Sequence, residues 1–275
     1  MQPATVVGLQ EPHASANLLA ESRAERLAAN ERADQQRYRA LRHVASCLDE
    51  IGVAGRRVLE VGMGDGAEAE QLIRRGARFS GLDLDRAVVE QVTTRMKDRD
   101  LPYDALRHGD VADLPWPSES FDIVFSHGLL DRLDDLTRAQ AELRRVLRPG
   151  GQLVVMVRAR RSWRYRVSLR GARRAAVVAA YPLARVGVPL PGRLGEHVQL
   201  ARRQGLAAAL ATDALLAASD GADRSPRRVF TRRDVETAFS SFTVSRAHQH
   251  VAPRALGPLS RWFGWHLWVH LTPRP

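Results

Sequence analysis

Val58-Leu59-Glu60-Val61-Gly62-Met63-Gly64-Asp65-Gly66 is the stretch that decides the fold of this 275-residue chain. An apolar strand runs directly into glycines at alternate positions, and glycine permits both a sharp turn and the close approach of a ligand to the main chain. Residues 68–75 are predicted to form a helix whose free N–H groups point at that ligand. The stretch therefore predicts a nucleotide-cofactor loop. A nicotinamide cofactor is an alternative, because Gly62, Gly64 and Ala67 also satisfy G-x-G-x-x-G/A, and a turn that binds nothing is another.

Carboxylates follow the next two predicted strands. Residues 78–84 are predicted to form a strand ending near Asp83, about 20 residues after the glycines, where a carboxylate can accept hydrogen bonds from ribose hydroxyls. The next strand carries Asp110 at its end, where a carboxylate can accept from an adenine amino group. Each aspartate could instead be a simple turn former. Together the two positions favour an adenosyl ligand.

The chain resembles the class I S-adenosylmethionine-dependent methyltransferases over residues 37–157. The resemblance rests on short segments in the family's order and spacing: Glu60-Val61-Gly62-Met63-Gly64-Asp65-Gly66, Gly81-Leu82-Asp83-Leu84, Gly109-Asp110-Val111, Leu114-Pro115-Trp116, Ser120-Phe121-Asp122 and Arg148-Pro149-Gly150-Gly151. It implies an α/β fold with a doubly wound, seven-stranded Rossmann-like sheet whose last strand is antiparallel, with helices on both faces. It also implies a helical cap inserted after the fifth strand. The implied cofactor is S-adenosyl-L-methionine, and the implied activity is methylation of a small molecule.

The resemblance further implies which residues hold the cofactor. Glu60 and the loop residues Gly62, Met63, Gly64 and Gly66 would hold the methionine moiety, Asp83 the ribose, and Asp110 with Val111 the adenine. Leu84 would pack on the adenine face, and Ser126 with His127 would line the sulfonium side. Tyr38 and Arg37 would close over the cofactor from the preceding helical segment. Core packing is the alternative for Leu84, Val111 and Tyr38, and a solvated position is the alternative for Arg37.

Methyl transfer needs mainly alignment from the protein, and a general base only where the acceptor must lose a proton early. His127, just past the fourth strand, is the first candidate base, with packing or a supporting hydrogen bond as the alternative. His197 in the cap is the second, with an ordinary surface position as its alternative. Asp131 is a further candidate, at a position where many family members carry histidine. A loop ion pair with Arg132 or another neighbour is the alternative for Asp131.

Length and composition predict one sizeable core with an accessory segment. We expect a disordered N-terminus at 1–14 and then a single domain at 15–275. That domain comprises an N-terminal helical segment (15–52), a cofactor-binding core (53–157), the cap insertion (158–231), and a final helix with two strands (232–275). The single cysteine, Cys47, lies in an apolar stretch and is predicted to be a buried structural thiol. One cysteine excludes an internal disulfide and a Cys-based zinc cluster, and no metal is expected.

The net charge of +11 comes almost wholly from arginine, which weakens any inference from total charge. Eight arginines fall in residues 158–174, interleaved with Trp163 and Tyr165. A solvated cap face is favoured there, an anionic substrate or lipid surface comes next, and nucleic acid is least favoured. Residues 175–190 could instead rest on a membrane surface. The aromatic cluster at 262–268 suits either the core face of an edge strand or an interface, so the oligomeric state stays open.

No targeting signal or membrane span is evident, and we expect a cytoplasmic protein. The predicted function is in-line methyl transfer to a small-molecule acceptor, which could be anionic or lipid-like. A nicotinamide-dependent oxidoreductase would leave Asp110 and the Leu-Pro-Trp segment without a role. A non-catalytic module that binds an adenosyl ligand, a lipid or a partner on the same fold is the other alternative.

Overall fold

The structure is a computed structural model, and it describes residues 42–133, 135–162, 173–186, 192–211, 228–250 and 266–274, with residues 24, 25, 27, 28, 31, 32, 171, 190 and 264. Several predicted features lie outside the described residues: the N-terminus at 1–14, Arg37, Tyr38, Trp163, Tyr165, Trp262 and Trp265.

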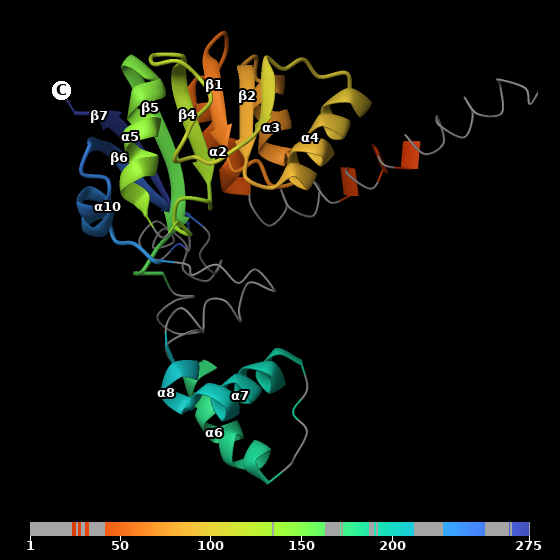
Figure 1. Ribbon diagram of the computed structural model, residues 1–275, viewed down its shortest axis with the longest axis vertical. Helices are drawn as coiled ribbons and strands as arrows, with labels where there is room; N and C mark the ends of the chain where they lie inside the picture. The colour runs from red at the N-terminus through yellow and green to blue at the C-terminus, as the bar shows by residue number, and fades with distance from the viewer. Residues whose placement is uncertain are drawn as a thin grey trace, which may run out of the picture.

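One mixed sheet organises the chain, in the strand order β3-β2-β1-β4-β5-β7-β6 (Figure 1). Its strands are β1 (Arg57–Val61), β2 (Arg78–Asp83), β3 (Ala105–His108), β4 (Phe121–His127), β5 (Leu147–Arg158), β6 (Phe242–His250) and β7 (His266–Pro273). The first five strands pair in parallel, whereas β7 runs antiparallel to both β5 and β6. The predicted fold class is confirmed. The order reverses between β1 and β4, which is where ligands of such sheets bind.

Helices cover both faces of the sheet because its strands bury side chains on each side. On one face, α2 (Arg42–Ile51), α3 (Ala67–Arg74) and α4 (Arg86–Asp98) pack on a core that includes Phe79 and Trp268. On the other face, α5 (Leu136–Val146) and α10 (Arg232–Ala238) pack on a second core. Trp268 is fully buried, so the core-face interpretation is confirmed for that residue of the aromatic cluster.

The sequence Pro149-Gly150-Gly151 predicts the end of a helix, but the connection from α5 to β5 differs from that prediction. The helix stops at Val146, and the strand begins at once at Leu147. Phe121 pairs with Leu147 while Ile123 pairs with Gln152, so residues 148–151 form a bulge. A Cβ on Gly151 would lie 2.9 Å from the Arg148 carbonyl oxygen, which explains why glycine occupies that position.

The insertion after β5 is helical, as predicted. It contains α6 (Arg174–Arg185), α7 (Gly192–Gln204) and α8 (Leu206–Ala209). These helices pack on one another around Val177 and Val198 and form a group of their own, beyond the carboxyl end of β5 (Figure 1). Pro182 lies inside α6 and does not end it, since Val186 N–H still closes the last turn on the Pro182 carbonyl (3.3 Å).

The alanine- and leucine-rich residues 199–218 predict one continuous helix, but the structure interrupts it at Gly205, whose φ of 92° cannot continue a helix. Threonine favours the helix N-cap, and Thr231 occupies that position in α10. Its side chain accepts from Asp234 N–H, and the Asp234 carboxylate accepts from Thr231 N–H, which completes a capping box. No helix in the described ranges is both long and apolar enough to cross a bilayer.

Candidate functional site

The glycine loop (residues 62–66) leaves the carboxyl end of β1 and leads into α3. Gly62, Gly64 and Gly66 all have positive φ, at 79°, 56° and 76°, a region that other residues rarely adopt. Gly62 N–H donates to the Leu82 carbonyl (2.8 Å), which fixes the loop to β2. A Cβ on Gly62 would lie 2.9 Å from the Leu129 Cβ, whereas one on Gly64 would meet nothing within 4 Å. The loop is therefore packed at one glycine and open to a ligand at another.

The helix predicted after the loop is present as α3, one residue earlier than expected. Gly66 is its N-cap, and the Asp65 side chain accepts from Ala67 N–H (3.1 Å). The first turn carries Glu68 and Glu70, both buried. Carboxylates at this end are stabilised by the helix dipole, which adds to their side-chain contacts.

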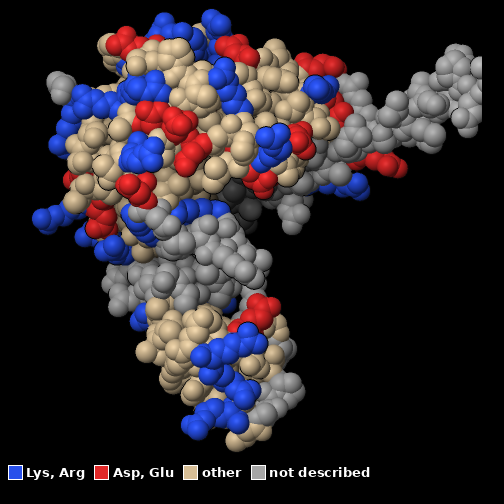
Figure 2. Space-filling view, viewed as in Figure 1, with Lys and Arg blue, Asp and Glu red and all other residues tan. Residues whose placement is uncertain are grey.

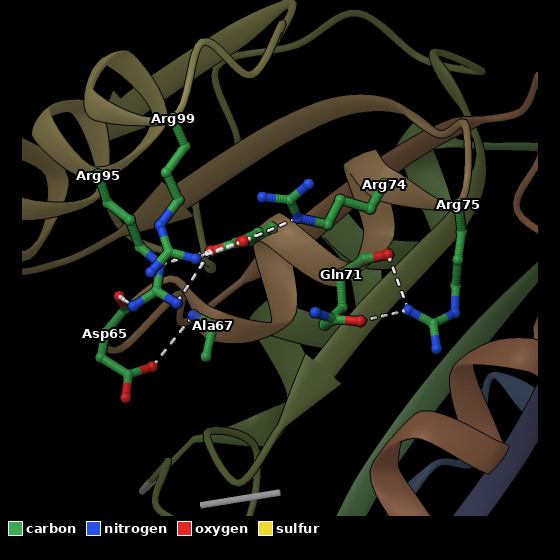
Figure 3. A network of polar contacts seen from close by, with 8 residues as sticks. Asp65, Ala67, Gln71, Arg74, Arg75, Arg95 and Arg99 are labelled. Atoms are coloured by element: carbon green, nitrogen blue, oxygen red, sulfur yellow. Dashed lines mark hydrogen bonds and ion pairs between the residues drawn. The ribbon is translucent and has the colours of Figure 1, made fainter. Parts of the chain in front are cut away.

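The second of these glutamates connects the loop to α4. Arg95 and Arg74 bind the Glu70 carboxylate at 3.0 and 2.8 Å, and Arg99 binds it as well. Figure 3 shows the three arginine side chains pointing toward one another, with Arg95 also reaching the Asp65 carbonyl (3.4 Å). Burial opposes ionisation of Glu70, but the hydrogen bonds from Arg74 and Arg99 and the charge of Arg95 lower its pKa below the ordinary value. The network holds the glycine loop against two helices.

The two predicted carboxylates stand at neighbouring strand ends. Gly109 N–H donates to the Asp83 carbonyl (2.9 Å) and so joins the turn after β3 to the end of β2. Asp83 Oδ1 accepts from Asp85 N–H (3.0 Å), and Asp110 Oδ1 accepts from Ala112 N–H (2.9 Å). Each aspartate thus shapes its own turn, as the turn-former alternative proposed. Each aspartate uses its Oδ1 for this contact, and both carboxylates stand at the carboxyl edge of the sheet.

The remaining predicted cofactor residues differ in their exposure. Leu84, directly after Asp83, is 69% exposed and is not part of the core. Val111 is buried in the core, as its core-packing alternative described. Met63 also lies in the core, where its Sδ would be 2.2 Å from a Cβ on Gly81. Glu60 is buried within β1.

The end of β4 carries Ser126 and His127. Ser126 is fully buried, and its Oγ has no hydrogen-bond partner within the described parts of the chain. His127 Nδ1 lies 2.9 Å from Glu68 Oε1, and its ring stacks on Trp268 at a centroid distance of 5.5 Å. A carboxylate that accepts from Nδ1 orients the ring and leaves Nε2 as the basic nitrogen. Sequence reasoning missed Glu68, because 59 residues separate it from His127.

Asp131 and His197 occupy positions that do not suit a catalytic base. Asp131 is fully buried and forms an ion pair with Arg158 at the end of β5. The ion-pair alternative is therefore observed, with Arg158 in place of Arg132. His197 is buried in the helical group, where its Nε2 lies 2.6 Å from the Ala209 carbonyl, and it is not the surface histidine that its alternative described.

The arginine-rich segment is not a uniform cationic surface. Arg158 is turned inward toward Asp131, Arg160 lies 3.4 Å from Asp234, and Arg174 donates to the Leu210 carbonyl (2.8 Å). Residues 163–170 lie outside the described part. The arginines that are described at these three positions serve contacts within the chain.

Comparison with known proteins agrees with this geometry. Residues 59–155 match the sequence profile of the family described as "Methyltransferase domain". The chain is 40% identical over 102 residues to a probable S-adenosylmethionine-dependent methyltransferase of Mycolicibacterium smegmatis, covering 37% of this chain and 38% of the relative. It is 39% identical over 106 residues to phthiotriol/phenolphthiotriol dimycocerosates methyltransferase 1 of Mycobacterium ulcerans, again covering 38% of each. These matches thus span about two fifths of each relative.

A solved structure shares the fold over a greater length. The PH0226 protein from Pyrococcus horikoshii OT3 superposes with a TM-score of 0.54 at 16% identity, covering 87% of this chain and 91% of that protein. The matched profile includes the glycine loop and both aspartates, and the likeness in fold to the Pyrococcus horikoshii protein extends beyond it. Residues 59–155 therefore match the methyltransferase domain family, and this part of the chain is similar to S-adenosylmethionine-dependent methyltransferases.

Proposed function

We propose that this protein transfers a methyl group from S-adenosyl-L-methionine to an apolar, lipid-like small molecule. The observation that carries the proposal is the glycine loop, open at Gly64 and followed by Asp83 and Asp110 at adjacent strand ends. Main-chain N–H groups at the loop would receive the carboxylate of the methionine moiety. Asp83 would bind the ribose, and Asp110 the adenine amino group.

The residues present fit this cofactor. A leucine that is 69% exposed beside Asp83 is an apolar surface that a planar adenine would cover. The absence of any atom within 4 Å of a Cβ on Gly64 leaves room for close approach to the main chain. When bound, the cofactor supplies an electrophilic methyl group on a sulfonium. The protein's contribution is chiefly to align the acceptor with that group.

His127 and Glu68 are proposed to remove the acceptor's proton. With Nδ1–H donating to Glu68 at 2.9 Å, Nε2 would take a proton from an acceptor hydroxyl. Glu68 would then stabilise the resulting imidazolium. Its position in the first turn of α3 ties this pair to the same loop that holds the cofactor.

The acceptor class is inferred from the helical group and from a relative. The outer face of α6 exposes Val178, Leu183 and Val186, the last of which is 78% exposed. Arg185, Arg202 and Arg203 are exposed on the same group, on which Figure 2 shows basic side chains gathered. Apolar side chains bordered by arginine suit contact with a lipid surface of negative charge. The M. ulcerans relative is likewise named as a methyltransferase of phthiotriol and phenolphthiotriol dimycocerosates.

Titration calorimetry tests the cofactor. We expect the purified chain to bind S-adenosylmethionine and S-adenosylhomocysteine but not NADH. Asp83→Ala should weaken binding at least about tenfold, because a charged hydrogen bond contributes about 1.5–3 kcal/mol. Asp104→Ala is the matched control, since Asp104 is an exposed aspartate at the opposite end of the same strands, where it pairs with Arg78 (3.5 Å). Binding of NADH alone would refute the proposal.

Steady-state kinetics test the base. We expect His127→Asn to lower kcat by about 100-fold or more while the affinity for S-adenosylhomocysteine stays nearly unchanged. Glu68→Gln should give a smaller loss and alter the pH profile, because it removes the group that orients the imidazole. Glu236→Gln, at an exposed position of α10, serves as the control. Equal kcat for His127→Asn and the control would exclude the base role.

Vesicle flotation tests the proposed contact of the helical group with a lipid surface. Anionic vesicles should retain the protein better than zwitterionic ones, and Leu183→Glu with Val186→Glu should release it. Ala207→Glu adds a charge at another exposed position of the same helical group and should have less effect. If the double variant bound vesicles as well as Ala207→Glu does, α6 would not be the contact.

A further inference from the structure

Cys47, His248 and His250 meet where α2 packs on the edge of the sheet. One ligand atom from each residue lies within 4.8 Å of the others. The Cys47 Sγ and the His248 Nε2 are separated by 3.4 Å. None of these residues belongs to the candidate active site, and the inference drawn from them is independent of the proposed methyl transfer.

The fold itself brings the three residues together. His248 and His250 are two positions apart on β6, so their side chains lie on the same face of the sheet. Their partners on β7 are Trp268 and His266. Cys47 lies on α2 and is buried in the core that includes Trp268. Its sulfur is therefore held over β6.

The geometry and the donor atoms suit a zinc ion. Zn–S and Zn–N bonds of about 2.3 and 2.0–2.1 Å at a tetrahedral angle place S and N about 3.5 Å apart. The observed 3.4 Å separation matches this value. The widest separation, 4.8 Å, needs only small rotations of histidine side chains that are half-buried. We propose that Cys47, His248 and His250 bind one Zn²⁺, with the fourth position open to water.

The charges around the cluster permit a cation. Glu50 lies one turn after Cys47 on α2 and pairs with Arg246 of β6 at 2.9 Å. Arg246 is thus balanced by a carboxylate. His270, whose ring lies 5.9 Å from that of His248, is a further imidazole on the same face.

A metal here would fasten α2 to the edge strand β6. The expectation of no metal rested on there being a single cysteine, whereas this site needs only one thiolate and two imidazoles. Residues 47 and 248 are 201 positions apart, so no spacing motif in the sequence predicts that they meet.

Cobalt substitution of the full chain tests the site. The protein is purified without a polyhistidine tag, stripped with a chelator and titrated with Co²⁺, and Zn²⁺ affinity is then measured by competition. We expect one equivalent of Co²⁺ to give a thiolate-to-cobalt charge-transfer band together with the strong visible bands of tetrahedral cobalt. Zinc should displace it and raise the Tm of the protein.

Variants separate the site from chance binding. Cys47→Ser should abolish the charge-transfer band, and His248→Gln or His250→Gln should weaken Zn²⁺ binding at least about 100-fold, since even loss of an outer partner costs 10–100-fold. His108→Gln, an exposed histidine on β3, should change nothing. A wild-type protein without the band overturns the proposal, whether or not the variants fold. So does a band that survives in Cys47→Ser.

Discussion

Gly62 and Gly64 differ in their surroundings although both have positive φ. Forcing a side chain into the left-handed region costs about 1–2 kcal/mol at either position. Only Gly62 adds a collision, because its Cβ would lie 2.9 Å from the Leu129 Cβ. We therefore expect Gly62→Ala to lower the free energy of unfolding more than Gly64→Ala, as measured by urea denaturation. Equal losses would mean that Leu129 moves aside without cost.

Asp131 is the residue at which a base and a structural ion pair can be told apart. Removing one partner of a buried pair typically costs about 3–5 kcal/mol, and Asp131→Asn leaves Arg158 without its counter-charge. We expect lower stability but an almost unchanged kcat per folded molecule. Asp135→Asn is the control, because asparagine is an equally good N-cap for α5. A loss of kcat without loss of stability would restore the base interpretation.

At the scale of elements, Glu70 joins α3 to α4. Glu70→Gln should cost about 3–5 kcal/mol in urea, because Arg95 and Arg99 are buried with it. Glu236→Gln removes an exposed pair with Arg232 and should cost less than about 1 kcal/mol. A loss no greater than that of the control would show that the network adds little.

The same network predicts a dependence of stability on pH. The folded-state pKa of Glu70 is lowered, so its contribution is fully present above the unfolded value of about 4.3 and disappears as the pH falls through the folded pKa. Unfolding measured between neutral and acid pH should therefore show a smaller acid-side loss in Glu70→Gln than in the wild type. Parallel pH profiles would contradict this assignment.

At the scale of the whole molecule, the sheet and the helical group have separate cores. Val198 is fully buried between α6 and α7 and contacts none of the residues of the two sheet cores. We expect Val198→Asp to unfold the helical group, because a buried charge without a partner is costly. The affinity for S-adenosylhomocysteine should stay nearly unchanged, whereas KM for the acceptor should rise. Loss of cofactor affinity in calorimetry would show that the two parts depend on each other.

The sequence by itself determined the alternation of strands and helices and the edge of the sheet at which the glycines and aspartates gather. Those features follow from local patterns: a strand that ends in glycines, aspartates at the ends of the next two strands, and alternating helices. Thr231 as a helix N-cap and Cys47 as a buried thiol were predictable for the same reason, since each depends on near neighbours.

Tertiary structure alone decided the contacts between distant residues. Glu68 beside His127, Arg158 beside Asp131, and Cys47 beside His248 join segments that only the folded sheet brings together. A single sequence predicts which element a residue occupies, because propensity and periodicity act over a few residues. Side-chain partners depend instead on the packing of whole strands and helices, and packing is what made Asp131 a buried ion pair and placed a cysteine over two histidines.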